Sequence, residues 1–196
     1  MIKRALISVT NKKNLNVLAS YLQECGVEII STGGTLKYLK QHNIKATDIT
    51  KITNFPEMMD GRLKTLHPKV HGGILGRRDI DTDIMAEYDI LPIDLVVVNL
   101  YDFGDAIAQP GVTMDTAIEN IDIGGPAMLR SAAKNNKDVV VLVNPEDYED
   151  FIDMDKSDVG ITPLQRLRYA QKVFTHTSMY DTTISQYMFH TIFKQL

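Results

Sequence analysis

The sequence predicts an α/β protein in which helices cover both faces of a mainly parallel, doubly wound sheet. Two observations indicate this class. Short, continuously apolar runs, typical of buried parallel strands, alternate with segments whose apolar residues recur at helical spacing. Glycine, hydroxyl and amide residues follow several of these runs, where doubly wound sheets place their ligand-binding loops. The chain has 196 residues, 44% hydrophobic and 23% charged, which is enough to bury one substantial core.

The first half of the chain is expected to alternate three strands with two helices. Residues 5–9 form an apolar run that reads as the first strand, and leucines at helical spacing over 14–25 predict the first helix. Gly26 stands where that helix would stop. We expect further strands over 27–30 and 45–49, separated by a helix that opens at 32–35.

The second half contains the strongest strand signal in the sequence, at 93–100, and a second buried strand at 139–143. Helical spacing predicts helices over 113–120, 126–136, 145–153 and 162–193, with Thr113 and Thr116 as candidate caps of the first. The last of these helices is unusually long. We therefore expect one domain over 1–196, with 162–196 a carboxyl-terminal helical segment.

Residues 61–73 form a basic, glycine-bordered segment without strand or helical periodicity. Such a segment is typical of a loop shaped around an anion. The whole chain carries a formal charge of −4, so this local positive charge runs against the average. An anionic small molecule is therefore the expected ligand, and the acidic balance argues against nucleic acid as the main partner.

Composition also indicates the cellular compartment in which we expect the protein. The single cysteine, Cys25, excludes an intramolecular disulfide and fits a reducing environment. No apolar run approaches the roughly 18 residues of a membrane span. We therefore expect a cytoplasmic protein without a membrane partner.

The turn Thr32-Gly33-Gly34-Thr35, between a strand and a helix, is a candidate phosphate cradle. Glycines allow close approach to the backbone, and a helix N-terminus presents free N–H groups. The alternative is a plain helix cap. Two hydroxyls and a cation follow the neighbouring first strand, and they favour the phosphate interpretation: Ser8, Thr10 and Lys12.

Other candidate residues each have a structural alternative. His67 and His71 have the spacing of a helical metal pair, but Pro68 lies between them, so we expect them to order a loop and expect no metal. Asp122 precedes Gly124 and a helix start, so it is either a capping residue or a general base beside backbone N–H donors. Lys134 lies near a helix end, where it complements the helix dipole or enters a site.

Taken together and in order, several segments resemble the IMP cyclohydrolase domain of the bifunctional purine-biosynthesis enzymes AICAR transformylase/IMP cyclohydrolase. The resemblance spans essentially the whole chain, and its most specific block is Lys64 to Pro68. The matching segments are Ile7-Ser8-Val9-Thr10-Asn11-Lys12, Ser31-Thr32-Gly33-Gly34-Thr35, Gly61-Arg62-Leu63-Lys64-Thr65-Leu66-His67-Pro68, Asn99-Leu100-Tyr101, Ile121-Asp122-Ile123-Gly124-Gly125, Ala132-Ala133-Lys134-Asn135 and Phe174-Thr175-His176-Thr177.

The resemblance implies a methylglyoxal-synthase-like fold. It also implies closure of the purine ring, from 5-formamidoimidazole-4-carboxamide ribotide to IMP, without a metal or organic cofactor. Carried over by motif, the 5′-phosphate would be held by Ser8, Thr10, Lys12, Thr32, Gly33, Gly34 and Thr35. The base and its carbonyl groups would contact Arg62, Lys64, Thr65 and Asn99. The catalytic residues would be Lys64, Tyr101, Asp122 and Lys134, and we expect a homodimer.

We assign provisional roles within that catalytic set. Asp122 would orient or deprotonate the carboxamide, and Lys134 would shuttle the proton and assist the departure of water. Lys64 with Tyr101 would stabilise the oxyanion, together with backbone N–H groups near Ile123 and Gly124. The roles of Asp122 and Lys134 are not separable at this level.

The sequence also departs from the family. Thr10-Asn11 stands where relatives more often have Ser-Asp, Asp102 where Pro is common, and Asn136 where His is frequent. Full-length relatives continue into a formyl-transferring transformylase domain, which these 196 residues do not contain. Two alternatives remain open: a methylglyoxal synthase, or a non-catalytic ribonucleotide-binding regulatory domain like that of carbamoyl phosphate synthetase.

Overall fold

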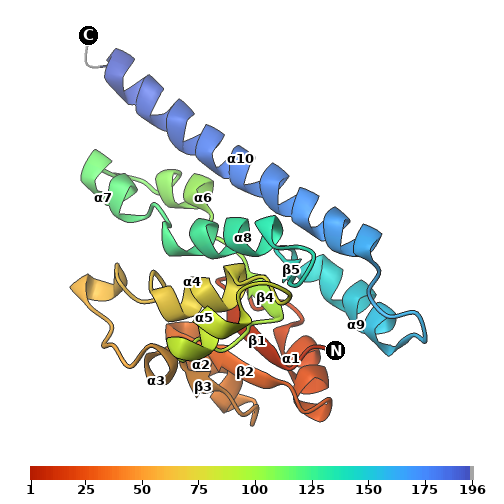
Figure 1. Ribbon diagram of the computed structural model, residues 1–196. Helices are drawn as coiled ribbons and strands as arrows, with labels where there is room; N and C mark the ends of the chain where they lie inside the picture. The colour runs from red at the N-terminus through yellow and green to blue at the C-terminus, as the bar shows by residue number, and fades with distance from the viewer. Residues whose placement is uncertain (195–196) are drawn as a thin grey trace.

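A five-stranded, all-parallel sheet forms the centre of the protein, with strand order β3-β2-β1-β4-β5 (Figure 1). The computed structural model describes residues 1–194. The strands are β1 (Arg4–Ser8), β2 (Glu28–Ser31), β3 (Thr47–Asp48), β4 (Leu95–Val98) and β5 (Val140–Leu142). Ile7 of β1 pairs with Ser31 on one side and with Val97 on the other. The carboxyl ends of these three strands therefore lie level, at one edge of the sheet.

Helices flank the sheet, which confirms the predicted α/β class. α1 and α2 lie on one side, and α4, α8 and α10 on the other (Figure 1). The helices are α1 (Leu15–Glu24), α2 (Gly33–Gln41), α3 (Ile49–Thr53), α4 (Pro68–Leu75), α5 (Thr82–Glu87), α6 (Phe103–Ile107), α7 (Met114–Glu119), α8 (Gly124–Lys134), α9 (Tyr148–Lys156) and α10 (Pro163–Lys194), with short 3₁₀ turns η1 (Met59–Gly61) and η2 (Pro145–Asp147).

The core explains why the strands read as unbroken apolar runs. All four residues of β4 and all three of β5 are at most 1% exposed. A strand covered by helices on both sides has no solvent face, so its residues do not alternate between apolar and polar. The strongest strand signal in the sequence thus marks the centre of the fold.

The segment 61–73 corrects one expectation, because its second half is helical. α4 begins at Pro68, in the first turn of a helix, where a missing N–H breaks no hydrogen bond. His67 caps this helix, since its Nδ1 accepts a hydrogen bond from the Lys69 N–H at 3.1 Å. The short helices α3, α5 and α6 were also not predicted, and the third strand is only Thr47–Asp48.

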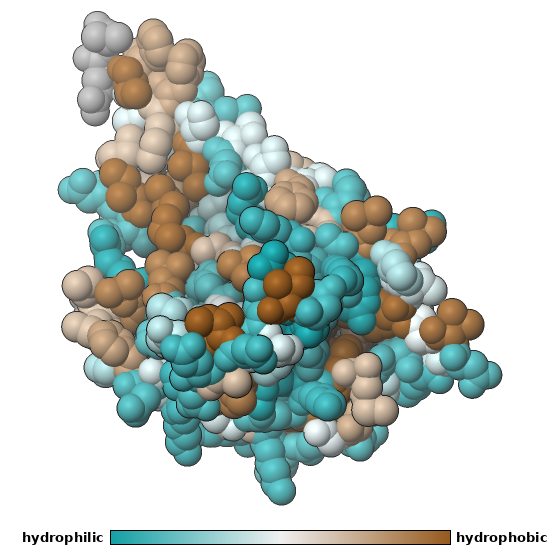
Figure 2. Space-filling view, viewed as in Figure 1, coloured by the Kyte–Doolittle hydropathy of each residue, from teal (hydrophilic) through white to brown (hydrophobic). Residues whose placement is uncertain are grey.

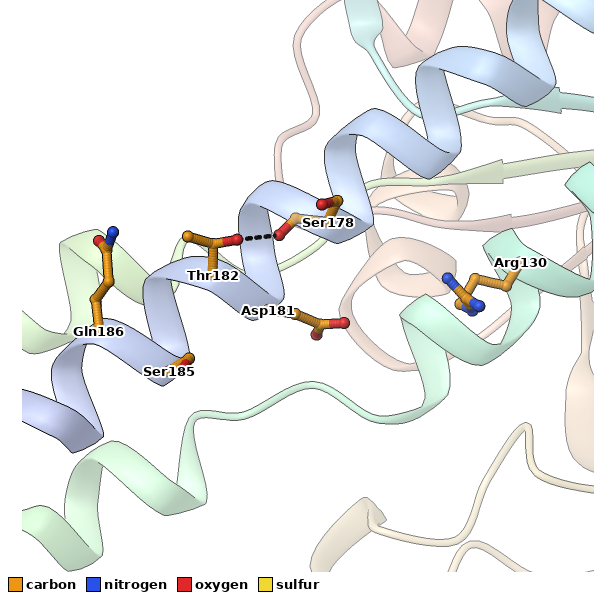
Figure 3. Close-up of a pocket in the computed structure, with 6 residues that line it drawn as sticks. All are labelled: Arg130, Ser178, Asp181, Thr182, Ser185 and Gln186. Atoms are coloured by element: carbon orange, nitrogen blue, oxygen red, sulfur yellow. Dashed lines mark hydrogen bonds between the residues drawn. The ribbon is translucent and has the colours of Figure 1, made fainter.

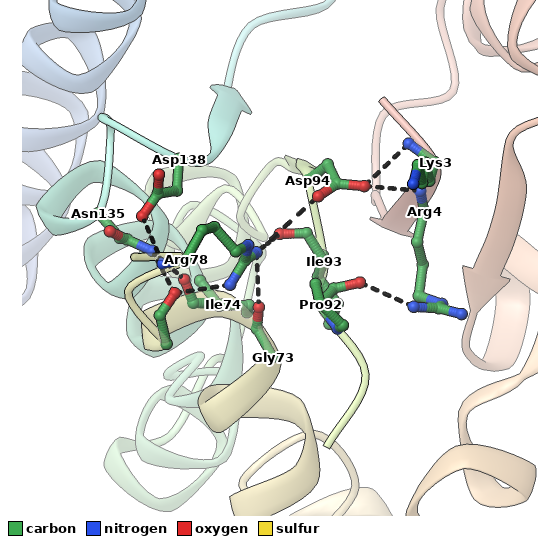
Figure 4. Close-up of polar contacts among 11 residues, drawn as sticks. Lys3, Arg4, Gly73, Ile74, Arg78, Pro92, Ile93, Asp94, Asn135 and Asp138 are labelled. Carbon is green, nitrogen blue, oxygen red and sulfur yellow. Dashed lines mark hydrogen bonds and ion pairs between the residues drawn. The ribbon is translucent and has the colours of Figure 1, made fainter. Parts of the chain in front are cut away.

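A polar cluster at the amino edge of the sheet centres on Arg78 (Figure 4). Its guanidinium donates to the carbonyls of Gly76 (2.6 Å), Gly73 (3.1 Å) and Ile93 (2.9 Å). Arg78 therefore ties the end of α4 to the chain that enters β4. The Gly73 carbonyl also accepts from the Ile93 N–H and the Gly76 carbonyl from the Asn135 amide, whereas the Ile93 carbonyl has its described donor in this one half-buried side chain.

α10 crosses α8 and then extends beyond α6 and α7 (Figure 1). Its first half is anchored by buried Tyr169 and Val173, whereas its last turns expose Phe189, Ile192 and Phe193. Figure 2 shows apolar side chains gathered along this projecting end. The helix predicted over 162–193 is therefore observed, as Pro163–Lys194, and the last two residues of the expected segment 162–196 lie outside the described part.

In the part of the chain described, no helix has the length and apolar character needed to cross a membrane.

Candidate active site

The predicted phosphate cradle forms where β1 and β2 end. The Ser8 and Thr32 hydroxyls lie 3.2 Å apart. The Thr35 hydroxyl donates to the Val9 carbonyl at 2.9 Å and accepts from the Val9 N–H at 3.0 Å. These contacts fasten the start of α2 to the loop after β1. The structure thus brings the two glycine- and hydroxyl-rich loops together, with the N-terminus of α2 between them.

Asn99 fixes the loop after β1 from the side of β4. Its side-chain oxygen accepts from the Thr10 N–H at 2.6 Å and the Asn11 N–H at 2.9 Å, and its amide nitrogen donates to the Asn11 carbonyl at 3.0 Å. Asn99 is 9% exposed. This differs from the expected contact with a base, because most of the amide's hydrogen-bonding capacity already holds the loop.

The Lys12 ammonium folds back over this loop. It donates to the carbonyls of Val9 at 3.3 Å and Thr10 at 3.2 Å. A positive charge therefore lies on the loop after β1 that helps to form the cradle. Long contacts to neutral carbonyls are readily exchanged for stronger, charge-assisted bonds to an anion.

Lys64 and Thr65 connect two distant helix N-termini. A Cβ added to Gly33, at the start of α2, would lie 2.8 Å from the Lys64 ammonium. A Cβ added to Gly124, at the start of α8, would lie 2.9 Å from the Thr65 hydroxyl. Two consecutive residues of the basic segment thus rest directly on two glycine backbones. Gly33 also has φ +46°, a left-handed conformation that favours glycine.

All three cations of the basic segment hold carboxylate partners that the sequence analysis missed, and that of Lys69 is Asp89, at 2.8 Å. The Lys64 ammonium lies 2.7 Å from Glu57 Oε1, and Arg62 pairs with Glu119 of α7. The Lys64 side chain is 19% exposed, whereas that of Arg62 is 65% exposed. An incoming anion would therefore compete with Glu57 at the more sheltered cation. No spacing or motif in the sequence identified Glu57 or Glu119 as partners.

Asp122 is held at the N-terminus of α8. Its Oδ1 accepts from the Gly125 N–H at 2.9 Å. Burial raises the pKa of this carboxyl, and the Gly125 N–H opposes the rise only in part. A side chain at Gly125 would not fit, because a Cβ there would lie 2.5 Å from Asp122 Oδ2 and 2.7 Å from Leu100 Cδ2. The residue therefore combines the expected capping with the environment of a general base.

Asp122 also has a partner on α10 that sequence reasoning did not find. Its backbone N–H donates to the Tyr180 hydroxyl at 2.7 Å, across 58 positions of sequence. Tyr180 is 8% exposed. Helical spacing identified it only as part of a long helix.

The structure does not bring Lys134 to this cluster. Gly124 and Lys134 are the first and last residues of α8, whose 11 residues place them about 15 Å apart at 1.5 Å per residue. Asn135, directly after, donates to the carbonyls of Ile74 and Gly76 at the other edge of the sheet. Within one chain, Lys134 therefore does not lie beside Asp122, in contrast to the amine–carboxylate pair that we expected.

Tyr101 and Ile123 lie at the correct edge of the sheet but point largely to solvent. They are 59% and 62% exposed. Tyr101 follows β4 through Leu100, whose side chain lies beside Gly125, so its backbone is close to the Asp122 segment. Its contact with an oxyanion stays a prediction.

The two histidines have separate partners. His67 caps α4, and His71 Nδ1 lies 3.1 Å from the Ser131 hydroxyl of α8. Burial lowers the pKa of His71. Among residues 1–194, with the Asp60 and Lys194 side chains left aside, no group of three His, Cys, Asp or Glu side chains is arranged to hold a metal ion.

Two shallow hollows of about 470 Å³ each occur on the surface. One lies between α8 and α10 and has a polar lining (Figure 3), made of Arg130, Ser178, Asp181, Thr182, Ser185 and Gln186. The other borders the start of α2, and its lining includes Gly33, Lys37 and Lys40. Only the second touches the predicted cradle.

Comparison with known proteins identifies two family models along the chain. The model described as the MGS-like domain matches residues 14–127, and that described as the AICARFT/IMPCHase bienzyme matches residues 132–195. A solved structure titled "Crystal structure of ForH" is 36% identical, with a TM-score of 0.85. That alignment covers 93% of this chain and 95% of the other.

Proposed function

Because the chain belongs to the MGS-like domain family and its remainder matches the AICARFT/IMPCHase bienzyme, we propose that it is an IMP cyclohydrolase of purine biosynthesis. The proposed reaction closes 5-formamidoimidazole-4-carboxamide ribotide to IMP and releases water. One observation carries the proposal: Lys64 and Thr65 rest on the N-termini of α2 and α8, between a hydroxyl-rich cradle and the half-buried carboxyl of Asp122. That arrangement offers one place for a phosphate and another for a reacting amide.

The phosphate would occupy the cradle at the N-terminus of α2. Free N–H groups of the helix, the Ser8 and Thr32 hydroxyls and the Lys12 ammonium are all donors or positive charges. A phosphate monoester carries acceptor oxygens only, once ionised. The ribose and imidazole would then extend towards Lys64 and Thr65. Arg62 and the backbone at Gly34 and Ile123 would complete the binding site.

The chemistry requires help because a carboxamide nitrogen is a weak nucleophile. In the proposed step, this nitrogen forms a bond to the formyl carbon while its proton passes to Asp122. The formyl oxygen becomes an oxyanion and takes the proton from Asp122 to become a hydroxyl. The C–O bond then breaks as the formamide nitrogen forms the ring C=N bond, and the proton lost from that nitrogen completes the departing water. A carboxyl with a raised pKa is a better base than an ordinary one once ionised. Lys64 would stabilise the oxyanion, with Tyr101 and the N–H groups at the start of α8 as further candidates.

This reaction changes no oxidation state, so the proposal calls for no redox cofactor. α8 separates Lys134 from the Asp122 segment of the same chain by about 15 Å. Lys134 therefore keeps a catalytic role in the proposal only if it acts in the site of a second chain. We also propose a cytoplasmic homodimer. The exposed Phe189, Ile192 and Phe193 near the end of α10 are the apolar surface that supports association.

One experiment separates the proposal from its two alternatives. The purified chain is incubated with the formamido ribotide, and IMP is followed by absorbance and mass spectrometry. Turnover supports the cyclohydrolase. Release of inorganic phosphate from dihydroxyacetone phosphate, without IMP formation, would instead indicate a methylglyoxal synthase. Calorimetric binding of IMP without either reaction would indicate a regulatory domain and would refute the proposed function.

A further inference from the structure

Tyr180 links the long helix α10 to two loops of the candidate active site. Its hydroxyl accepts the Asp122 N–H at 2.7 Å. Its ring packs edge-on against Phe103, with centroids 6.4 Å apart and planes at 75°. Phe103 begins α6, two residues after Tyr101, and is 2% exposed. One side chain of α10 therefore touches both the segment that follows β4 and the segment that carries Asp122.

We infer that Tyr180 is a positioning residue, which fixes the backbone of Asp122 so that its carboxylate meets the substrate amide. This inference rests on the proposed cyclohydrolase function. It assigns to Tyr180 no contact with substrate. The hydroxyl acts only through the Asp122 N–H, and the ring acts only through Phe103.

Two hydrogen bonds hold Asp122, one at its side chain and one at its backbone, and each restricts a different movement. The Gly125 N–H bonds to Oδ1 and fixes the rotation of the carboxylate. The Tyr180 hydroxyl bonds to the backbone N–H and fixes where the Cα lies. Together these bonds leave Oδ2 as the oxygen available to a substrate. Displacement by about 1 Å is enough to reduce turnover strongly when a base must meet one proton.

The position of Tyr180 in the chain gives α10 a role in the site. The match to the MGS-like domain ends at residue 127, and Tyr180 lies in the part matched by the bienzyme model. Asp122 lies within the first match. The hydrogen bond between them therefore makes the carboxyl-terminal helix a support for a residue of the MGS-like part.

The test compares Tyr180→Phe with a matched control, Tyr187→Phe. Both tyrosines lie on α10 and pack edge-on against Phe103, Tyr187 at 5.8 Å. The described contacts give only Tyr180 a hydroxyl bond to the Asp122 segment. Loss of one hydrogen bond corresponds to a change of about 3- to 10-fold. We expect kcat of Tyr180→Phe to fall by at least that factor, with KM and IMP affinity within about twofold of the wild type. Tyr187→Phe should leave all three unchanged.

A second measurement is independent of activity. In ¹⁵N-labelled protein, the Asp122 amide should exchange about 10-fold faster in Tyr180→Phe, while amides of β4 keep their rates. An unchanged kcat and an unchanged Asp122 amide in this variant would overturn the inference. If the variant folds poorly, exchange in the wild type still tests the inference. An Asp122 amide that exchanges without protection in the wild type would contradict its hydrogen bond to the Tyr180 hydroxyl. Absence of turnover by the wild type would refute the proposed function instead, which separates the two failures.

Discussion

A methyl group added at Gly125 should damage both the stability and the proposed chemistry. A Cβ at Gly125 would lie 2.5 Å from Asp122 Oδ2 and 2.7 Å from Leu100 Cδ2, so at least one of these side chains must move. Overpacking of this kind costs about 1–3 kcal/mol. Loss of the Asp122 bond to the Gly125 N–H adds about 1 kcal/mol. Alanine returns up to about 1 kcal/mol through its higher helix propensity.

The net loss for Gly125→Ala is therefore about 1–4 kcal/mol. For a chain of this length each kcal/mol lowers Tm by about 2–4 °C, so Tm should fall by about 2–16 °C. Turnover should fall at least about 100-fold, because the moved residue is the proposed base. Melting followed by circular dichroism and IMP formation followed by absorbance measure the two effects.

Gly124→Ala is the matched control. Its Cβ would meet only the Thr65 hydroxyl, at 2.9 Å, and that group can rotate away. It controls for stability alone, because Thr65 belongs to the proposed site, and we expect its Tm to stay much closer to that of the wild type. The reasoning is refuted if Gly125→Ala is as stable as Gly124→Ala.

Three further predictions follow from the charged and buried groups. Asp122→Asn should lose at least about 100-fold in turnover without lowering Tm at pH 7. Burial raises the pKa of Asp122 in the folded protein above its ordinary value of about 4. The folded state of the wild type should therefore lose stability as pH rises between these two pKa values, and that of Asp122→Asn should not. Parallel curves of Tm against pH for the two proteins would contradict this. Arg78→Met leaves the Ile93 carbonyl without its donor and removes one of two donors at the Gly73 and Gly76 carbonyls. It should lower the free energy of unfolding by about 1–3 kcal/mol in urea titrations, against less than about 1 kcal/mol for the exposed Arg77→Met, and equal effects would argue against the cluster. Lys134→Ala should reduce kcat less than Lys64→Met does, because α8 holds Lys134 about 15 Å from Gly124. The reverse order in steady-state assays would contradict this and would indicate that Lys134 contacts the substrate bound by a second chain.

Local patterns were sufficient to predict the α/β class and the main strands, although not the short helices α3, α5 and α6. β4 was identified by its apolar run because burial on both faces removes alternation, and the turn at Gly33 was placed correctly between β2 and α2. The sequence also placed Ser8, Thr32 and Lys12 at one edge, since the carboxyl ends of parallel strands meet there.

Contacts between distant segments were not predictable in this way. Glu57, Glu119 and Tyr180 act through partners whose pairing depends on loop paths and on the direction of α10, which no spacing encodes. The distance of Lys134 from Asp122 has a different cause. The two residues flank α8, and a helix of 11 residues separates its ends however specific the motif at each end is.

The most direct test of the central claim is the affinity of the chain for IMP, measured by titration calorimetry in the wild type and in Lys64→Met. The claim is that a ribonucleotide spans the cradle and the Lys64–Thr65 bridge. A charge-assisted bond to Lys64 predicts that the variant binds IMP at least about 10-fold more weakly. Equal affinities in the two proteins, or no binding by the wild type, would contradict the claim.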